Sequence, residues 1–133
     1  DLGTPEKYLK VHRDILEGVF QSEDYDFCRN PQFISNTARI NPSATIIGPV
    51  YIGNNVEIGA FSVIGPNTVL CDSSSVGIGA RIEGSVVWDH VHVGNGASII
   101  DSIVMSNCKV DKEIKKSSII YAGNLSYSIA AVR

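Results

Sequence analysis

Residues 40–82 have the sequence INPSATIIGPVYIGNNVEIGAFSVIGPNTVLCDSSSVGIGARI, in which an aliphatic residue returns at every sixth position. The repeated positions are Ile40, Ile46, Ile52, Ile58, Ile64, Leu70, Val76 and Ile82. A period of six is neither the 3.6-residue period of an amphipathic helix nor the two-residue period of one long strand. It indicates a solenoid in which each unit is a short strand followed by a bend.

Stacking brings the repeated aliphatic residues into line. If three units make one triangular coil, eighteen residues advance the chain by one strand spacing of about 4.8 Å. Three interior ladders are then predicted: Ile40, Ile58 and Val76; Ile46, Ile64 and Ile82; Ile52, Leu70 and Trp88. A second register, four residues after each aliphatic residue, is small or β-branched and comprises Ala44, Val50, Val56, Ser62, Thr68, Ser74, Ala80 and Val86.

Glycine directly follows several of the aliphatic residues, at Gly53, Gly59, Gly65 and Gly77. We expect a bend there in which glycine adopts a positive φ at little cost. Beyond residue 82 the repeat changes, with Trp88 where an aliphatic residue is due. Five-residue steps are predicted from Trp88 to Val93 and from Met105 to Val110. An indole is too large for an interior corner, so altered geometry or an outward Trp88 is expected here.

The two ends of the chain have other patterns. Thr4-Pro5-Glu6 predicts the start of a short α-helix with Tyr8, Leu9, His12, Ile15, Leu16 and Val19 on one side and a stop at Gly18. Three regions follow: residues 1–20 as the end of a preceding domain with its linking helix, 21–39 as a connector, and 40–133 as the solenoid. The charged stretch 111–116 is expected to break the repeat as a cap, and residues 119–121 suit one last strand.

Composition excludes several classes of function. The chain has 133 residues and a formal net charge of −3, and only Arg39, Arg81 and Lys109 are basic between residues 39 and 109. Nucleic acid is therefore an unexpected partner. No apolar stretch is long enough to span a membrane, and no secretory signal is visible. Because the first residue is Asp1 and not Met, an excised fragment is expected. Cys28, Cys71 and Cys108 form no C-x-x-C pair, which suits a reducing cytoplasm.

The repeat from residue 40 to 110 resembles the hexapeptide motif of left-handed parallel β-helices. The fold class expected is mainly β, a left-handed parallel β-helix of hexapeptide repeats with one short N-terminal α-helix. The left-handed sense of the β-helix is implied by this resemblance alone. Residues 1–9, DLGTPEKYL, resemble the D-[IL]-G-T-P-x-x-Y-L stretch that closes the catalytic domain of sugar-1-phosphate nucleotidyltransferases. Mannose-1-phosphate guanylyltransferase-like and glucose-1-phosphate nucleotidyltransferase-like proteins are the nearest in pattern.

This resemblance implies a C-terminal module for assembly and regulation. The parent enzyme would convert a nucleoside triphosphate and a sugar 1-phosphate into a nucleotide sugar and pyrophosphate with Mg²⁺. Asp1 would be a magnesium ligand only in that intact parent. The fragment lacks the upstream catalytic domain with its phosphate-binding loop, so no catalytic residue, no cofactor and no nucleotidyl transfer are expected of it alone.

An alternative is a hexapeptide acyltransferase that uses acetyl-CoA with His90 or His92 as general base. These two residues alternate around Val91 and are expected to point the same way, while two exposed histidines are the plainer interpretation. A zinc site of the carbonic-anhydrase kind needs three converging histidines, and the third, His12, lies in the predicted helix.

Self-association is the remaining expectation. A β-helix has flat faces and two ends that carry unpaired strand groups, which favours burial against another copy. Val63, Val69, Val87 and Phe61 are candidates for an apolar patch. A homotrimer is the first expectation for the assembly and a homodimer the second.

Overall fold

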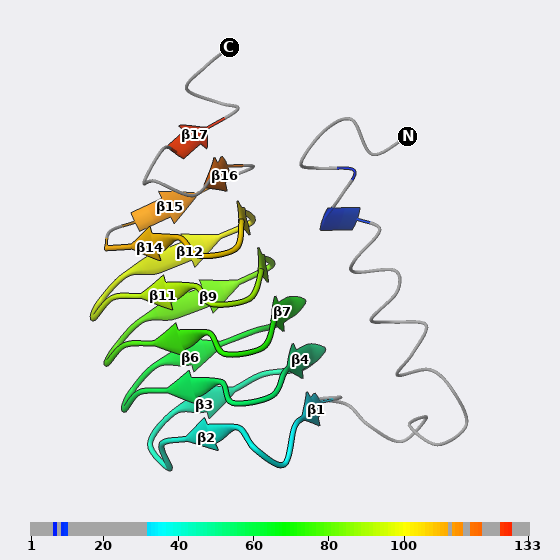
Figure 1. Cartoon of the computed structure of the whole chain (residues 1–133), viewed down its shortest axis with the longest axis vertical. Coiled ribbons are helices and arrows are strands. Elements are labelled where there is room, and N and C mark those ends of the chain that lie inside the picture. Colours follow the sequence, from blue (N-terminus) through cyan, green and yellow to red (C-terminus); the bar gives the residue numbers. More distant parts are fainter. Residues whose placement is uncertain are drawn as a thin grey trace.

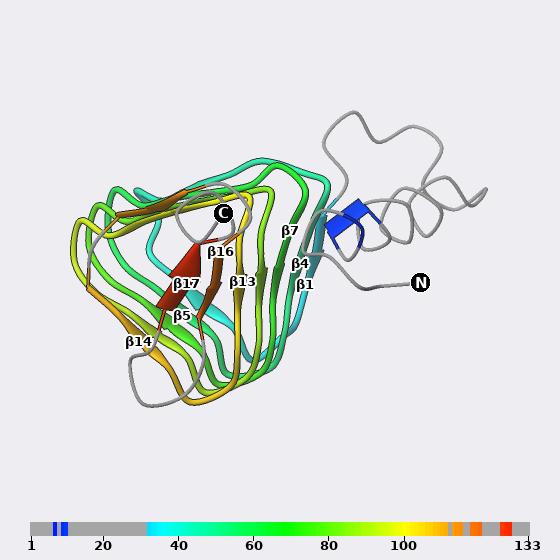
Figure 2. The same cartoon turned by 90° about the horizontal axis from the view of Figure 1, so that it is seen from above.

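Short parallel strands wound into a three-sided prism make up the body of the molecule (Figures 1 and 2). The computed structural model describes residues 32–111, the backbone of the strands at 113–115, 118–120 and 126–128, and residues 7, 9 and 10. Successive strands of one sheet come from successive coils, because each sheet takes every third strand of the chain. The predicted parallel β-helix is therefore confirmed.

Three sheets form the sides of the prism. Sheet A has the order β1-β4-β7-β10-β13-β16-β17, with β1 (Gln32–Ile34), β4 (Val50–Ile52), β7 (Thr68–Leu70), β10 (Val86–Val87), β13 (Ile103–Val104), β16 (Ser118–Ile120) and β17 (Ser126–Ser128). Sheet B contains β2 (Arg39–Ile40), β5 (Glu57–Ile58), β8 (Ser75–Val76), β11 (His92–Val93) and β14 (Lys109–Val110). Sheet C contains β3 (Thr45–Ile46), β6 (Val63–Ile64), β9 (Arg81–Glu83), β12 (Ser98–Ile100) and β15 (Glu113–Lys115).

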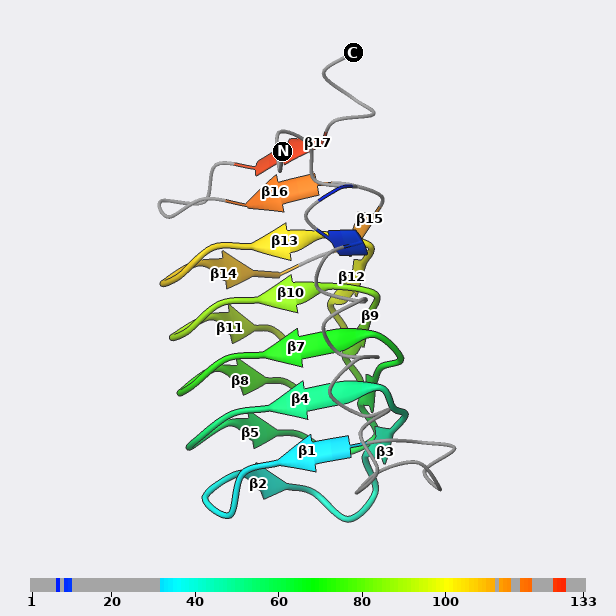
Figure 3. The same cartoon turned by 90° about the vertical axis from the view of Figure 1, so that its right-hand side faces the viewer.

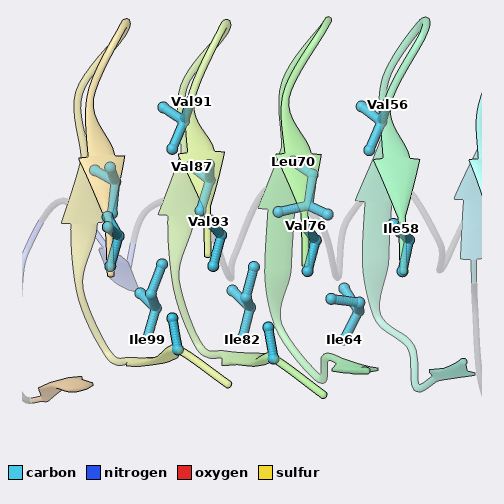
Figure 4. Packing of buried hydrophobic residues seen from close by; sticks show 14 of the residues in the cluster. Val56, Ile58, Ile64, Leu70, Val76, Ile82, Val87, Val91, Val93 and Ile99 are labelled. Carbon is cyan, nitrogen blue, oxygen red and sulfur yellow. The ribbon is translucent and has the colours of Figure 1, made fainter. Parts of the chain in front are cut away.

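The interior of the prism is built from the aliphatic ladders. Strand pairing places Ile40 beside Ile58 and Ile58 beside Val76, and it places Ile46, Ile64 and Ile82 in a second column. Figure 4 shows Ile58 and Val76 of the first column, and Ile64 and Ile82 of the second, stacked from coil to coil inside the prism. Burying each such side chain contributes about 1.5–3 kcal/mol. Two of the three predicted ladders are thus confirmed as written.

The third ladder differs from the prediction at Trp88. Leu70 pairs with Val87, seventeen residues on, and Val87 pairs with Val104. The five-residue steps therefore run from Ile82 to Val87 and from Ile99 to Val104. The prediction that these steps begin at Trp88 and Met105 is wrong, because the ladder residues are Val87 and Val104, each one residue earlier. Because Val87 takes the interior site, Trp88 packs outside with Val69, Val86 and Ile103. The expectation of an outward Trp88 is confirmed.

Small residues of the second register fill the interior beside the bends. Val50, Val56, Ser62, Thr68, Ser74 and Ala80 are all buried. The buried hydroxyls donate to carbonyl oxygens of nearby bends, as from Ser62 Oγ to Gly59 O at 2.7 Å and from Ser74 Oγ to Trp88 O at 2.7 Å. Hydroxyls satisfied in this way are buried at low cost. The sequence pattern predicted Val86 in this buried register. The five-residue step from Ile82 to Val87 places Ser85 there instead.

Glycine is required mainly because adjacent coils lie close together. Gly65 has the expected positive φ, of +100°, whereas Gly53, Gly59 and Gly77 do not. A Cβ added at Gly59 would lie 2.8 Å from the carbonyl carbon of Gly77 and 2.9 Å from the nitrogen of Ile78. Residues with positive φ fall instead on the corners, for example Asn55, Ser73 and His90 on one corner.

The solenoid begins before residue 40, and its coils continue through the charged stretch 111–116. Strand β1 lies within the range predicted as connector and pairs with β4. Strand β15 lies within the charged stretch predicted to break the repeat, yet Ile114 pairs with Ile99 in regular register. Strand β16 confirms a further strand, and β17, which no pattern indicated, pairs with it antiparallel. An antiparallel strand ends the parallel stacking of sheet A.

The predicted N-terminal helix is described only in part. Lys7, Leu9 and Lys10 are helical. The other predicted helical positions and the stop at Gly18 lie outside the described residues. No helix among the described segments has the length and apolar character needed to cross a bilayer.

The close approach of the coils yields a first prediction, on Gly59→Ala. Its Cβ would meet backbone atoms that cannot rotate away, so we expect a loss of about 1–3 kcal/mol in the free energy of unfolding. Gly94→Ala is a matched control in the same column, because its Cβ would first meet the mobile carboxylate of Asp111 at 3.2 Å. Urea unfolding measures both variants. Equal stability of the two would contradict this explanation.

Candidate functional site

The outward face of sheet A is apolar along most of its height. The side chains that alternate with its interior ladder belong to Phe33, Tyr51, Val69, Val86 and Ile103. Phe33 and Tyr51 stack with ring centroids 5.0 Å apart and planes 8° apart. A sheet face exposed only to water would carry polar residues here. This face is therefore suited to be covered by protein.

The equivalent positions of sheets B and C are mostly polar. Sheet B presents Arg39, Glu57, Ser75, His92 and Lys109, and sheet C presents Thr45, Val63, Arg81 and Ser98. Arg39 forms an ion pair with Glu57, and Arg81 Nη2 lies 2.9 Å from Glu83 Oε1. Val87, expected in an outward patch, lies in the interior, whereas Phe61 is 72% exposed at a corner between sheets B and C.

Leu9 covers part of the apolar face of sheet A. It is only 4% exposed and forms a cluster with Val86 and Ile103, against which Val69, Trp88 and Met105 pack. Figure 3 shows the short helical segment, in blue, in front of this sheet near β13. The cluster joins a residue near the start of the chain to strands more than seventy residues later. We call Leu9, Val69, Val86, Trp88, Ile103 and Met105 the docking cluster.

Two aspects of this cluster were missed in the sequence. The residue before each ladder residue is apolar throughout sheet A, as in Tyr51-Ile52 and Val69-Leu70, whereas in the described strands of sheets B and C only Val63 is, and this alternation is a signal that could have revealed the face. Trp88 Nε1 is buried without a hydrogen-bond partner in the part of the chain that the structure describes. Burying an unpaired donor costs about 1–3 kcal/mol. The position of Trp88 is therefore favoured by the packing of its ring and opposed by burial of its N–H group.

The two candidate histidines do not form one site. His90 lies on a corner with φ of 56°, and its Nδ1 is 3.0 Å from Asp89 Oδ2. His92 lies on β11, and its Nδ1 shares a hydrogen bond of 2.7 Å with Ser75 Oγ. They line separate hollows, so the expectation that they point the same way is wrong. Both are exposed, as the plainer interpretation held.

His92 borders an open hollow on sheet B. The hollow has a volume of about 830 Å³, and its walls include Arg39, Glu57, Gly59 and Gly77. In the Ser75–His92 pair, the ring nitrogen that faces Ser75 is already engaged. A general base also needs a bound substrate within hydrogen-bond reach. Arg39 and Glu57, the two charged residues beside His92 in this hollow, are paired with each other.

No metal centre is formed by the described residues. Among them, no three His, Cys, Asp or Glu side chains come together as metal ligands. Asp1, the predicted magnesium ligand of a parent enzyme, and His12 lie outside the described part of the chain.

The two described cysteines are poorly nucleophilic. Burial, followed by the negative charges of Asp72 and Asp89, raises the pKa of Cys71 to about 11. Burial also raises the pKa of Cys108. Because the thiolate is the reactive form, neither residue suits nucleophilic catalysis near neutral pH.

Comparison with known proteins gives one family. Residues 46–124 match the model of the GMPPB C-terminal domain. The chain is 29% identical over 99 residues to mannose-1-phosphate guanylyltransferase of Mycobacterium tuberculosis, covering 74% of the chain and 23% of that protein. It is 36% identical over 106 residues to UTP–glucose-1-phosphate uridylyltransferase of Synechocystis, covering 78% of the chain and 23% of that protein. The chain thus spans about a quarter of the length of these relatives.

Among solved structures, the acetyltransferase domain of PglB from Neisseria gonorrhoeae matches with a TM-score of 0.47 and 16% identity. The match covers 89% of the chain and 67% of that domain. No function follows from a likeness at this level.

The docking cluster predicts how Leu9→Ala will behave. Truncating a fully buried leucine costs about 2–3 kcal/mol. The helical segment should therefore detach from sheet A more often, by roughly thirtyfold or more. Trypsin cleavage after Lys7 and Lys10 measures this opening and should accelerate by that factor. Ile47→Ala, which truncates a side chain 38% exposed, is the control and should leave cleavage unchanged. An unaltered rate in Leu9→Ala would refute the docking.

The raised pKa of Cys71 predicts slow alkylation. At pH 8 its thiolate fraction should be about a hundredfold below that of a thiol with the ordinary pKa of 9.0. The rate with iodoacetamide should rise about tenfold per pH unit until near pH 11. Peptide-resolved mass spectrometry isolates Cys71 from the other cysteines, and urea-unfolded chain serves as control. A plateau near pH 9 in the folded chain would show that the thiol is not perturbed.

Proposed function

The chain belongs to the GMPPB C-terminal domain family, and we propose that it is the C-terminal β-helix module of a sugar-1-phosphate nucleotidyltransferase. In this role it assembles copies of the enzyme and regulates a catalytic domain that precedes it. Two relatives, named as a mannose-1-phosphate guanylyltransferase and a UTP–glucose-1-phosphate uridylyltransferase, support the proposal, since the chain matches about a quarter of each.

The docking cluster is the single observation that carries this proposal. Leu9 belongs to the segment that resembles the close of a catalytic domain, and its side chain is buried on the outward face of sheet A. A segment held in this way ties the end of the preceding domain to the solenoid. The β-helix then sets the position and spacing of the catalytic domains in an assembly, and a change at this face reaches the catalytic domain through the same contact.

The parent reaction is a displacement at phosphorus. A phosphate oxygen of the sugar 1-phosphate attacks the α-phosphorus of the nucleoside triphosphate, the bond to the β-phosphate oxygen breaks, and pyrophosphate leaves. The described residues do not fit a magnesium site, because they bring no three candidate ligands together. The proposal therefore assigns Mg²⁺ to the upstream domain, with Asp1 as one ligand there.

We also propose a cytoplasmic homo-oligomer, with a trimer first and a dimer second. The scattered positions of Cys28, Cys71 and Cys108, which form no C-x-x-C pair, support a reducing compartment. Large apolar side chains exposed on the described surface support self-association, namely Phe33, Ile47, Tyr51, Phe61 and Ile78. Sedimentation of the chain at tens of micromolar should show a complex of defined size, and a strict monomer would contradict this part of the proposal.

The activity of the chain alone and of the protein with its natural upstream sequence tests the proposal. With a nucleoside triphosphate, Mg²⁺ and mannose or glucose 1-phosphate, the longer protein should release pyrophosphate and the chain alone should not. The rival function, acetyl transfer from acetyl-CoA, is measured by release of free CoA. Turnover of acetyl-CoA by the chain alone, lost in His90→Ala or His92→Ala, would overturn the proposal in favour of an acyltransferase.

A further inference from the structure

A second hollow lies where sheet A meets the neighbouring corner. Its volume is about 400 Å³, and we call it the Trp88 hollow, lined by Tyr51, Cys71, Asp72, Trp88, Asp89 and His90. Cys71 and Trp88 occupy equivalent positions directly after the ladder residues of two successive coils, so a small side chain lies beside a large indole in the wall of the hollow. The hollow is thus a product of the repeat.

The walls of this hollow are aromatic. Tyr51 is held by its stacking against Phe33. Trp88 is held by the docking cluster. Both rings are therefore fixed before anything binds, and a ligand that contacts them loses little affinity to ordering of the protein.

The corner side of the hollow is negatively charged. Asp72 and Asp89 occupy equivalent positions on successive coils, and no lysine or arginine is among the residues that line the hollow. Hydrogen bonds from Ser106 and His90 lower the pKa of Asp89, which keeps its carboxylate ionised. Asp72 Oδ1 accepts a hydrogen bond of 2.8 Å from the Asn54 backbone N–H. Both carboxylates are held in place yet retain lone pairs for a ligand.

The Cys71 thiol, which lines the hollow, is subject to this charge. Burial raises the pKa of Cys71 first, and the carboxylates of Asp72 and Asp89 raise it further. The charges of these two carboxylates, which disfavour a thiolate, also disfavour phosphate and favour a cation at the same position. Sugar phosphates and nucleotides are therefore poor candidates for this hollow.

We propose that the Trp88 hollow binds an arginine side chain of a partner polypeptide. A guanidinium is planar, stacks on aromatic faces and donates paired hydrogen bonds to a carboxylate. The hollow supplies indole and phenol rings beside two carboxylates, and an arginine side chain fits within it. An ammonium is a compact charge that uses the flat rings less well. This binding site is independent of the nucleotidyltransferase assignment, since it rests on charge and shape alone.

Fluorescence of Trp88, the single tryptophan of the chain, provides the test. Titration of the 133-residue chain with N-acetyl-arginine amide should give a saturable change with a midpoint on the order of millimolar. N-acetyl-citrulline amide has nearly the same shape without the charge and should bind at least tenfold more weakly. An equal response to both compounds, or no saturable change with the arginine compound, would overturn the proposal.

Variants connect this response to the carboxylates. The double variant Asp72→Asn, Asp89→Asn keeps an oxygen acceptor at each position, so the corner should remain folded while arginine binding weakens at least tenfold. Glu57→Gln removes an acid from sheet B and is the matched control, with binding unchanged. If circular dichroism shows the double variant unfolded, the salt dependence of the wild-type chain decides instead. Binding should weaken from about 0.02 M to about 0.5 M salt, and insensitivity to salt would overturn the proposal.

Discussion

Backbone hydrogen bonding between adjacent coils is the constraint on which the rest of the structure depends. Each short strand has too few residues to be stable alone, and it pairs with the strand one coil below and one coil above. Pairing keeps the coils in register, and register keeps the ladder residues inside the prism. When a coil shortens from eighteen to seventeen residues, as between Leu70 and Val87, the ladder is preserved and the change appears at the surface. Trp88 is placed outside for this reason.

The three outward faces then differ although their strands are built alike. Sheets B and C present mostly polar side chains, some of which form surface ion pairs that contribute little to stability. Sheet A presents aromatic and aliphatic side chains, and Leu9 is buried against them. The fold itself leaves the identity of outward residues free, so this difference points to contacts that function requires.

Chemistry at the described surface is directed at binding. His90 and His92 are separated and exposed, and the thiols of Cys71 and Cys108 are held in their protonated form. The strongest clustering of charge and aromatic rings occurs at the Trp88 hollow, beside the docking cluster. Both features share Trp88, so one side chain contacts the segment near Leu9 and also forms a wall of the hollow. A partner bound in the hollow would therefore lie next to the connection to a preceding domain.

Much of the fold was predictable from the sequence by itself, because a column of stacked side chains requires one residue type at a fixed interval. Ile40, Ile46, Ile52, Ile58 and Ile64 meet this requirement, and both the coils and the ladders follow from it. The position of the shortened steps was not predictable, since Val87 and Trp88 are both apolar and only pairing with Leu70 shows which one enters the core. The same holds for the docking cluster and the Trp88 hollow. Their residues lie far apart in the chain: packing on the outward face of sheet A brings Leu9 to Ile103, and the stacking of coils brings Tyr51 to Trp88.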